Sequence, residues 1–114
     1  MRNLIKIFKA LSDGNRIRIL KMLEIRSLCV CEITAVLALA NSTVSKHLAI
    51  LRDAELILDE KVGKWVNYHL NRSKSEPYVS ELLPMLAKWL PDDEIVRGDA
   101  EKVKSVDRNV LCAA

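Results

Sequence analysis

The feature that most constrains this chain is a change of hydrophobic period near its middle. In the first half, apolar residues recur at helical spacing, as at Val44, Leu48 and Leu51. Over residues 57–70, apolar and polar residues alternate on either side of Gly63, which is the pattern of a β-hairpin. Each period fits one kind of element, so the sequence predicts a mainly α chain with a small β-hairpin.

Six segments have the apolar spacing or the capping residues of helices. They lie at about residues 4–11, 15–23, 30–37, 43–54, 77–90 and 94–104. Asp13 or Asn15 can cap the second helix, and Asn41-Ser42 can cap the fourth. Pro84 predicts a kink or a restart in the fifth. We expect one domain over residues 1–104 and a tail over residues 105–114.

The third and fourth expected helices form a helix-turn-helix pattern. The third is short, a break of about four residues follows, and the fourth has a polar N-terminal face. The hairpin comes directly after this pair, in the position of a wing. We therefore expect a winged helix-turn-helix domain.

Charge is unevenly distributed along the chain. Residues 1–74 hold 13 Lys and Arg against 7 Asp and Glu, whereas residues 75–114 hold 5 against 8. This asymmetry favours a polyanion-binding module followed by an interaction element, although solvated charge would scatter in a similar way. The sequence has no secretory signal, no apolar segment long enough to span a bilayer and an odd number of cysteines, so we expect a cytoplasmic protein without membrane contact.

Several short blocks occur in a fixed order along the chain. They are Ala10-Leu11-Ser12-Asp13, Arg16-Ile17-Arg18-Ile19-Leu20, Leu28-Cys29-Val30-Cys31-Glu32-Ile33, Val44-Ser45-Lys46-His47-Leu48, Leu51-Arg52-Asp53-Ala54-Glu55-Leu56 and Val62-Gly63-Lys64-Trp65-Val66-Asn67-Tyr68. Together they closely resemble the ArsR/SmtB family of metal-responsive repressors over residues 4–104. The pair Cys29 and Cys31 is similar to the arsenic-responsive branch of that family.

The resemblance implies a homodimer paired through the first and fifth helices. It also implies that operator DNA is released when arsenite or antimonite binds. Two recognition helices in a dimer would meet successive major-groove faces, so we expect an imperfect inverted repeat as the operator. The fifth expected helix has no histidine, so the family's zinc or cobalt site across that helix lacks its ligands.

A DNA-reading helix needs small polar side chains near its N-terminus and cations for phosphates. Arg52 lies later on the helix and would touch the DNA backbone or an acidic neighbour. Alternatives are a plain cap for Ser42, packing of His47 on the third helix, and a merely solvated hairpin tip. The DNA-binding candidates are Ser42, Thr43, Ser45, Lys46, His47, Arg52, Lys61 and Lys64.

Cys29 and Cys31 are the candidate metal ligands at the start of the third expected helix. Positions i and i+2 of a regular helix point about 200° apart, so both thiols can bind one ion only if the first turn is extended or frayed. A helix N-terminus lowers a thiol pKa, and thiolate suits soft ions. Distortion of that turn would act directly on the helix pair.

The third sulfur ligand is less defined. Arsenic-responsive members often have a third cysteine shortly after the pair, whereas this chain has Thr34. Cys112 could complete the site from the same or the partner subunit, or an exogenous ligand could do so. Alternatively, Cys112 is a free tail cysteine, and Cys29 and Cys31 are small buried hydrophobes.

Three other functions are alternatives to a metalloid-responsive repressor. A thiol-redox repressor would pair Cys29 or Cys31 with Cys112. A small thiol redox enzyme would use Cys29 and Cys31, but the chain lacks a C-x-x-C motif and the catalytic motifs of hydrolases and phosphate loops, so we expect no enzyme activity. An interaction module without DNA binding is disfavoured by the retained polar and basic residues.

Overall fold

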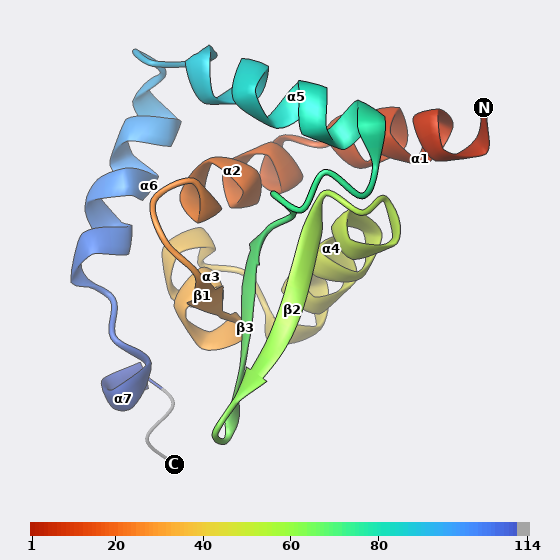
Figure 1. Ribbon diagram of the computed structural model, residues 1–114. Coiled ribbons are helices and arrows are strands. Elements are labelled where there is room, and N and C mark those ends of the chain that lie inside the picture. Colours follow the sequence, from red (N-terminus) through yellow and green to blue (C-terminus); the bar gives the residue numbers. More distant parts are fainter. Residues whose placement is uncertain (112–114) are drawn as a thin grey trace.

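The computed structural model describes residues 1–111 as a small helical body from which a β-hairpin projects (Figure 1). The elements are α1 (Arg2–Leu11), α2 (Gly14–Leu23), β1 (Leu28–Cys29), α3 (Val30–Leu37), α4 (Asn41–Asp53), β2 (Ile57–Val62), β3 (Trp65–Leu70), α5 (Pro77–Lys88), α6 (Glu94–Ser105) and α7 (Arg108–Leu111). The predicted winged helix-turn-helix, mainly helical with a small hairpin, is confirmed.

The helix starts follow local hydrogen bonding. Asp13 caps α2, because its carboxylate accepts from the N–H groups of Asn15 and Arg16 at 2.8 and 3.2 Å. The expected cap of α4 is wrong: the helix already begins at Asn41, and the N-cap residue is Ala40. The Asn41 side chain instead accepts a 3.0 Å hydrogen bond from the Thr34 hydroxyl, which ties α4 to α3.

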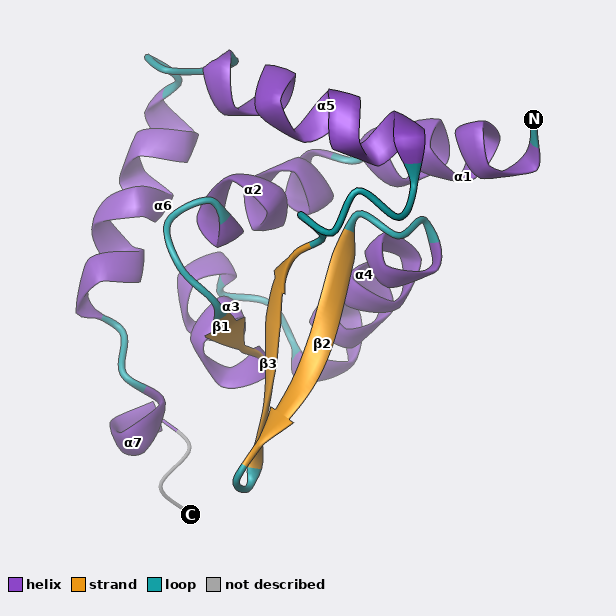
Figure 2. Ribbon diagram, viewed as in Figure 1, coloured by secondary structure: helices purple, strands orange, loops and turns teal. Residues whose placement is uncertain are grey.

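The sheet has three antiparallel strands in the order β1-β3-β2 (Figure 2). Gly63, with φ +61°, makes the turn of the hairpin, as the alternation predicted. The two-residue strand β1 was not expected. It places Cys29 opposite Asn67, so the start of the helix-turn-helix and the wing share one ladder of strands.

The core lies where α2, α3 and α4 meet the inner face of the sheet. Ile19, Leu20, Ile33, Leu48 and Leu56 are among its fully buried side chains. These helices bury the hydrophobic stripes that their spacing predicted, which fixes the orientation of their polar faces. The candidate residues on α3 and α4 therefore lie on helices that pack against the core.

The C-terminal helices are joined to this body by polar contacts. Arg18 of α2 donates two hydrogen bonds, of 2.8 and 2.9 Å, to the buried carboxylate of Asp99 on α6. The buried ammonium of Lys21 donates to the carbonyls of Leu86 and Trp89, at the end of α5. Such donors satisfy the last carbonyls of a helix, which have no partner within it.

The C-terminal half contains one short helix more than expected. Of the two expectations at Pro84, a kink or a restart, the restart does not occur, because α5 continues through Pro84 to Lys88 as one helix. The region expected as a tail contains α7, which packs against α3. Residues 112–114, with Cys112, lie outside the described part of the chain.

Over residues 1–111, no single helix is long and apolar enough to cross a membrane. Only α3 and α4 together would meet the length and composition requirement, and they are bent by 112°.

Candidate nucleic-acid interface and cysteine site

The N-terminal part of α4 presents a polar surface to solvent. Val44, Leu48 and Leu51 are buried and hold the helix against the core. The opposite face is exposed and offers small hydroxyls and one ammonium group to a ligand. Its exposed side chains are Ser42, Thr43, Ser45 and Lys46. This arrangement can bring short polar groups to the base edges of a DNA groove.

His47, the fifth candidate on α4, is placed differently. It is half-buried, and its Nδ1 lies 3.3 Å from Nη1 of Arg16 on α2. The same guanidinium donates to the carbonyls of Ala10 and Lys9 at the end of α1. Because arginine is always a donor, Nδ1 accepts in this contact. His47 therefore links α4 to the α1–α2 corner.

Arg52 pairs with an acidic neighbour, one of the two expected roles. Its guanidinium forms an ion pair with Asp59 on β2. This pair joins the end of α4 to the first strand of the wing. Arg52 thus differs from the exposed polar residues at the start of α4.

The wing tip carries the remaining cations. Lys61 and Lys64 are both exposed, on either side of the Gly63 turn at the free end of the hairpin (Figure 1). The ammonium of Lys64 lies 4.8 Å from the centre of the Trp65 ring, a cation–π distance. We call the exposed α4 residues 42, 43, 45 and 46, together with Lys61 and Lys64, the reading surface.

Cys29 and Cys31 lie on either side of the change from strand to helix. Cys29 is the extended N-cap residue of α3, with φ −89° and ψ 169°, whereas Cys31 lies in the first helical turn. The two cysteines therefore do not occupy positions i and i+2 of a regular helix, because Cys29 has an extended backbone. Cys29 is a buried free thiol; Cys31 is half-buried and makes a side-chain interaction of its own.

The pKa of the Cys29 thiol is raised above its ordinary value, although the thiol lies at a helix N-terminus. Burial raises its pKa, and the neighbouring Glu32 carboxylate adds to this effect. The N–H groups of Glu32 and Cys31 only partly offset the increase. The expected lowering of the thiol pKa is therefore wrong for Cys29, because desolvation outweighs the helix terminus.

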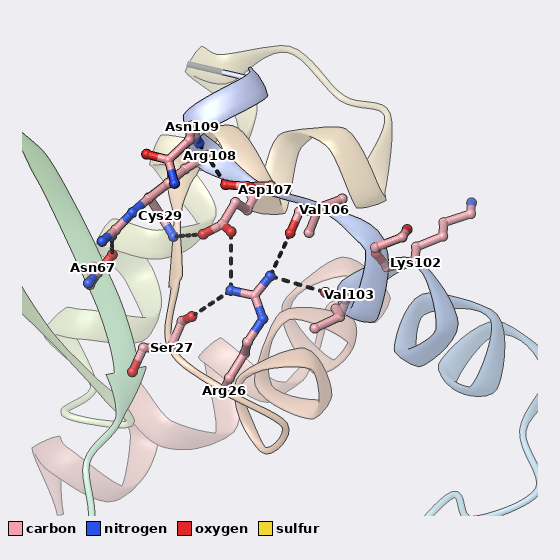
Figure 3. Close-up of polar contacts among 12 residues, drawn as sticks. Arg26, Ser27, Cys29, Asn67, Lys102, Val103, Val106, Asp107, Arg108 and Asn109 are labelled. Carbon is pink, nitrogen blue, oxygen red and sulfur yellow. Dashed lines mark hydrogen bonds and ion pairs between the residues drawn. The ribbon is translucent and has the colours of Figure 1, made fainter. Parts of the chain in front are cut away.

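A buried carboxylate connects this turn to a loop arginine (Figure 3). Glu32 Oε1 accepts a 3.0 Å hydrogen bond from the Cys29 N–H, and its Oε2 pairs with Arg26 at 3.1 Å. Arg26 also donates to the carbonyls of Val103 and Val106 at 3.1 and 2.9 Å. One guanidinium therefore joins the cysteine-bearing turn to the end of α6. We call residues 26–32 the cysteine junction.

The C-terminal segment (residues 103–111) crosses this junction and reaches the wing (Figure 3). Arg108 donates a 2.6 Å hydrogen bond to Oδ1 of Asn67, and its guanidinium lies 4.6 Å from the Trp65 ring centre. Residues of the segment, the junction and the wing together line a polar cleft of about 550 Å³. It is lined by Arg26, Ser27, Glu32, Asn67, Lys104, Ser105, Val106, Asp107, Arg108 and Asn109.

Within residues 1–111, no cluster of three His, Cys, Asp or Glu side chains is placed to hold a metal ion. Two cysteines are near one turn, and the third candidate, Cys112, follows the last described residue. The sequence did not reveal Arg26, Glu32, Asn67 or Arg108 as parts of this site. A glutamate three residues after an N-cap is a capping signal that would have indicated Glu32.

Comparison with known proteins identifies the helix-turn-helix. Residues 13–58 match the family described as "Bacterial regulatory protein, arsR family". The chain is 37% identical over 109 residues to the arsenical resistance operon repressor of Escherichia coli K12, covering 93% of this chain and 83% of that protein. It is 39% identical over 77 residues to the arsenical resistance operon repressor of Bacillus subtilis, covering 67% and 73%.

Solved structures agree with this comparison. Reduced HlyU from Vibrio cholerae superposes with a TM-score of 0.61 at 32% identity, covering 75% of this chain and 85% of that one. The cadmium sensor CmtR from Mycobacterium tuberculosis gives 0.57 at 30% identity, covering 75% and 84%. A further match, HlyU from Vibrio vulnificus, is described as a transcriptional regulator, in line with the two operon repressors.

Proposed function

This chain belongs to the ArsR family of DNA-binding transcriptional repressors, and we propose that trivalent arsenic or antimony releases it from its operator. Cys29, Cys31 and Cys112 supply the sulfur ligands. The observation that carries the proposal is the placement of Cys29 and Cys31 across a strand-to-helix junction on the first helix of the DNA-binding pair. The relatives named as arsenical resistance repressors support arsenic as the inducer.

The third ligand is supported by the path of the C-terminal segment. α7 packs against α3 and ends at Leu111, one residue before Cys112. Consecutive Cα atoms are about 3.8 Å apart, so Cys112 follows a residue that is already beside the cysteine-bearing helix. The described part of the chain therefore ends in a helix that packs on α3, which begins next to Cys29.

The ligand exchange is balanced without a redox partner. Arsenite enters as As(OH)₃, and each As–S bond that forms replaces one As–O bond. The thiol proton leaves with the displaced hydroxide as water. Serine cannot replace cysteine here, because the soft metalloid prefers sulfur to a hydroxyl oxygen.

Dimerisation accounts for an apolar surface that one subunit leaves uncovered. α1, α5 and the C-cap residue of α5 carry exposed large apolar side chains, which cost free energy in water. They include Ile5, Phe8, Tyr78, Met85 and Trp89. We propose that a second copy covers them, so that two reading surfaces meet an imperfect inverted repeat in operator DNA. The contacts to DNA come from Ser42, Thr43, Ser45, Lys46, Lys61 and Lys64, with His47 and Arg52 supporting α4 and the wing.

The decisive experiment measures operator binding by anisotropy while arsenite, zinc or a disulfide oxidant is added separately. Cys29→Ser and Cys31→Ser should fold, dimerise and bind DNA, yet keep the operator when arsenite is added. Cys112→Ser should lower arsenite affinity and leave two sulfur neighbours around arsenic by X-ray absorption. Full inducibility of the Cys29→Ser, Cys31→Ser double variant would overturn the proposal.

A second candidate function is a thiol-redox repressor. The observation that favours it is the same approach of α7 to α3, which brings the chain preceding Cys112 towards Cys31. In that case, the oxidant releases the operator and arsenite does not, and Cys112→Ser abolishes the response completely. The experiment described above therefore separates the two functions.

A further inference from the structure

The cysteine junction and the wing are neighbours in one β-ladder. Asn67 lies on the central strand β3, directly opposite Cys29 on β1 and opposite Glu60 on β2. A displacement of the Cys29 backbone must therefore be absorbed by the β1–β3 pairing, next to Asn67. This strand contact is the shortest structural route between the cysteines and the wing.

The C-terminal segment holds both sides of that contact. On the junction side, Arg26 joins the carbonyls of Val103 and Val106 to the Glu32 carboxylate. On the wing side, Arg108 donates to Asn67. The segment therefore links the cysteine-bearing turn at the start of α3 to the central strand β3.

Arg108 also acts on the part of the wing that carries the reading cations. Its guanidinium and the Lys64 ammonium lie 4.6 and 4.8 Å from the centre of the same Trp65 ring. A planar guanidinium can lie flat on an aromatic ring while its in-plane N–H groups donate hydrogen bonds, whereas a lysine ammonium is a compact charge that cannot stack flat. Arg108 thus fixes the ring against which Lys64 rests.

We propose that Arg108 is a positioning residue that holds the wing in its DNA-binding arrangement and transmits ligand binding at the cysteines to it. Ligation at Cys29 shifts the junction relative to the C-terminal segment. The contacts of Arg108 with Asn67 and Trp65 then weaken, and the wing tip loses its fixed position. This inference rests on the proposed function, since it concerns how the ligand at the same cysteines lowers operator affinity.

The test compares Arg108→Ala with the wild-type chain by operator anisotropy, with and without arsenite. We expect the metal-free variant to bind operator about three- to tenfold more weakly, and the arsenite-induced loss of affinity to shrink by a similar factor. Arsenite affinity of the DNA-free variant should not fall. Arg108→Lys, which keeps the charge but not the planar group, should behave like Arg108→Ala.

A matched control and a local probe exclude simpler explanations. Lys104→Ala removes one positive charge from the same segment, where Lys104 pairs with Glu101 on its own helix; it should bind and release operator as the wild type does, within about twofold. Trp89→Phe leaves Trp65 as the single tryptophan and keeps an aromatic side chain at the proposed dimer surface, so this background is first checked for wild-type dimerisation and operator release. In that background, arsenite should change Trp65 emission when Arg108 is present and leave it unchanged in Arg108→Ala.

The outcomes separate this inference from the function on which it rests. A wild-type chain that arsenite does not release from operator would overturn both. If the wild type is released and Arg108→Ala has the same operator affinity and release, only the role of Arg108 is wrong. Wild-type behaviour of Arg108→Lys would likewise reduce Arg108 to a charge near DNA and overturn its positioning role.

Discussion

The reading surface and the cysteine junction use polar residues in opposite ways. On the reading surface, Ser45 and Lys46 are exposed and stand on a helix whose other face is buried. At the junction, the Glu32 side chain is only 4% exposed and has partners on both oxygens. The comparison teaches that the proposed DNA contacts stand on a helix packed against the core, whereas the proposed sensor site is held by long-range hydrogen bonds that a new ligand would have to rearrange.

The largest expected difference between the two regions is in stability. Arg26→Ala should lower the free energy of unfolding by about 2–3 kcal/mol, because it leaves the buried Glu32 carboxylate without its cation and two carbonyls without a donor. Urea denaturation measures this change. Lys104→Ala, which removes an exposed ion pair, should cost less than about 0.5 kcal/mol. Equal losses of unfolding free energy in the two variants would show that the contacts of Arg26 stabilise the chain no more than an exposed ion pair does.

The second difference concerns the reactivity of Cys29. In a chain with Cys31→Ser and Cys112→Ser, alkylation by iodoacetamide should accelerate about tenfold from pH 7 to pH 8, since the raised pKa keeps the thiol protonated at neutral pH and only the thiolate reacts. The rate is followed by mass spectrometry, with the same chain unfolded in urea as the reference. An alkylation rate that does not change between pH 7 and pH 8 would mean that the helix N-terminus lowers the pKa of Cys29 by more than burial raises it.

The third test acts on the reading surface. Lys46→Ala should leave stability unchanged within about 0.5 kcal/mol. It should weaken binding to all DNA sequences, and the slope of log affinity against log salt should become shallower by about 1 for each lost phosphate contact per subunit. Lys64→Ala should do the same if the wing tip also meets phosphate. An unchanged slope for both variants would show that the reading surface lies elsewhere.

The smallest expected effect distinguishes two residues of α4. His47→Ala removes an acceptor of Arg16 and should lower the free energy of unfolding by about 0.5–1 kcal/mol. Ser45→Ala should leave stability unaffected and alter the preference among operator sequences. Thermal denaturation and competition binding measure the two quantities. If His47→Ala changes operator preference without any loss of stability, its contact with Arg16 is incidental and His47 belongs to the reading surface.

The sequence predicted those parts of the fold that depend on local pattern. The third helix was expected at residues 30–37 and is found at Val30–Leu37, because its apolar spacing and flanking residues agree. The wing was predicted because two short segments with a period near two, the second with Val66, Tyr68 and Leu70 on one face, meet at Gly63. The strand β1 could not be predicted, since two residues show no period.

The network around the cysteines was not predictable for a different reason. Arg26 reaches carbonyls 77 and 80 residues later in the chain, and Arg108 reaches Asn67 across 41 residues. Such contacts depend on tertiary placement and leave no local spacing to detect. The pKa of Cys29 was misjudged for the same reason, because burial of a side chain depends on which segments cover it.

The outer edge of the sheet also affects the behaviour of the chain at high concentration. β2 forms this edge, and the backbone N–H and C=O groups on its outer side are able to hydrogen-bond to a strand of another molecule. The sequence Asp59-Glu60-Lys61 places three consecutive charges on that edge, and the other edge strand, β1, has only two residues. Pairing of two β2 edges would place these charged residues in the new interface. Pairing at β1 could form only a few hydrogen bonds, because that strand has two residues. A projecting hairpin of this composition can remain exposed without seeding aggregates.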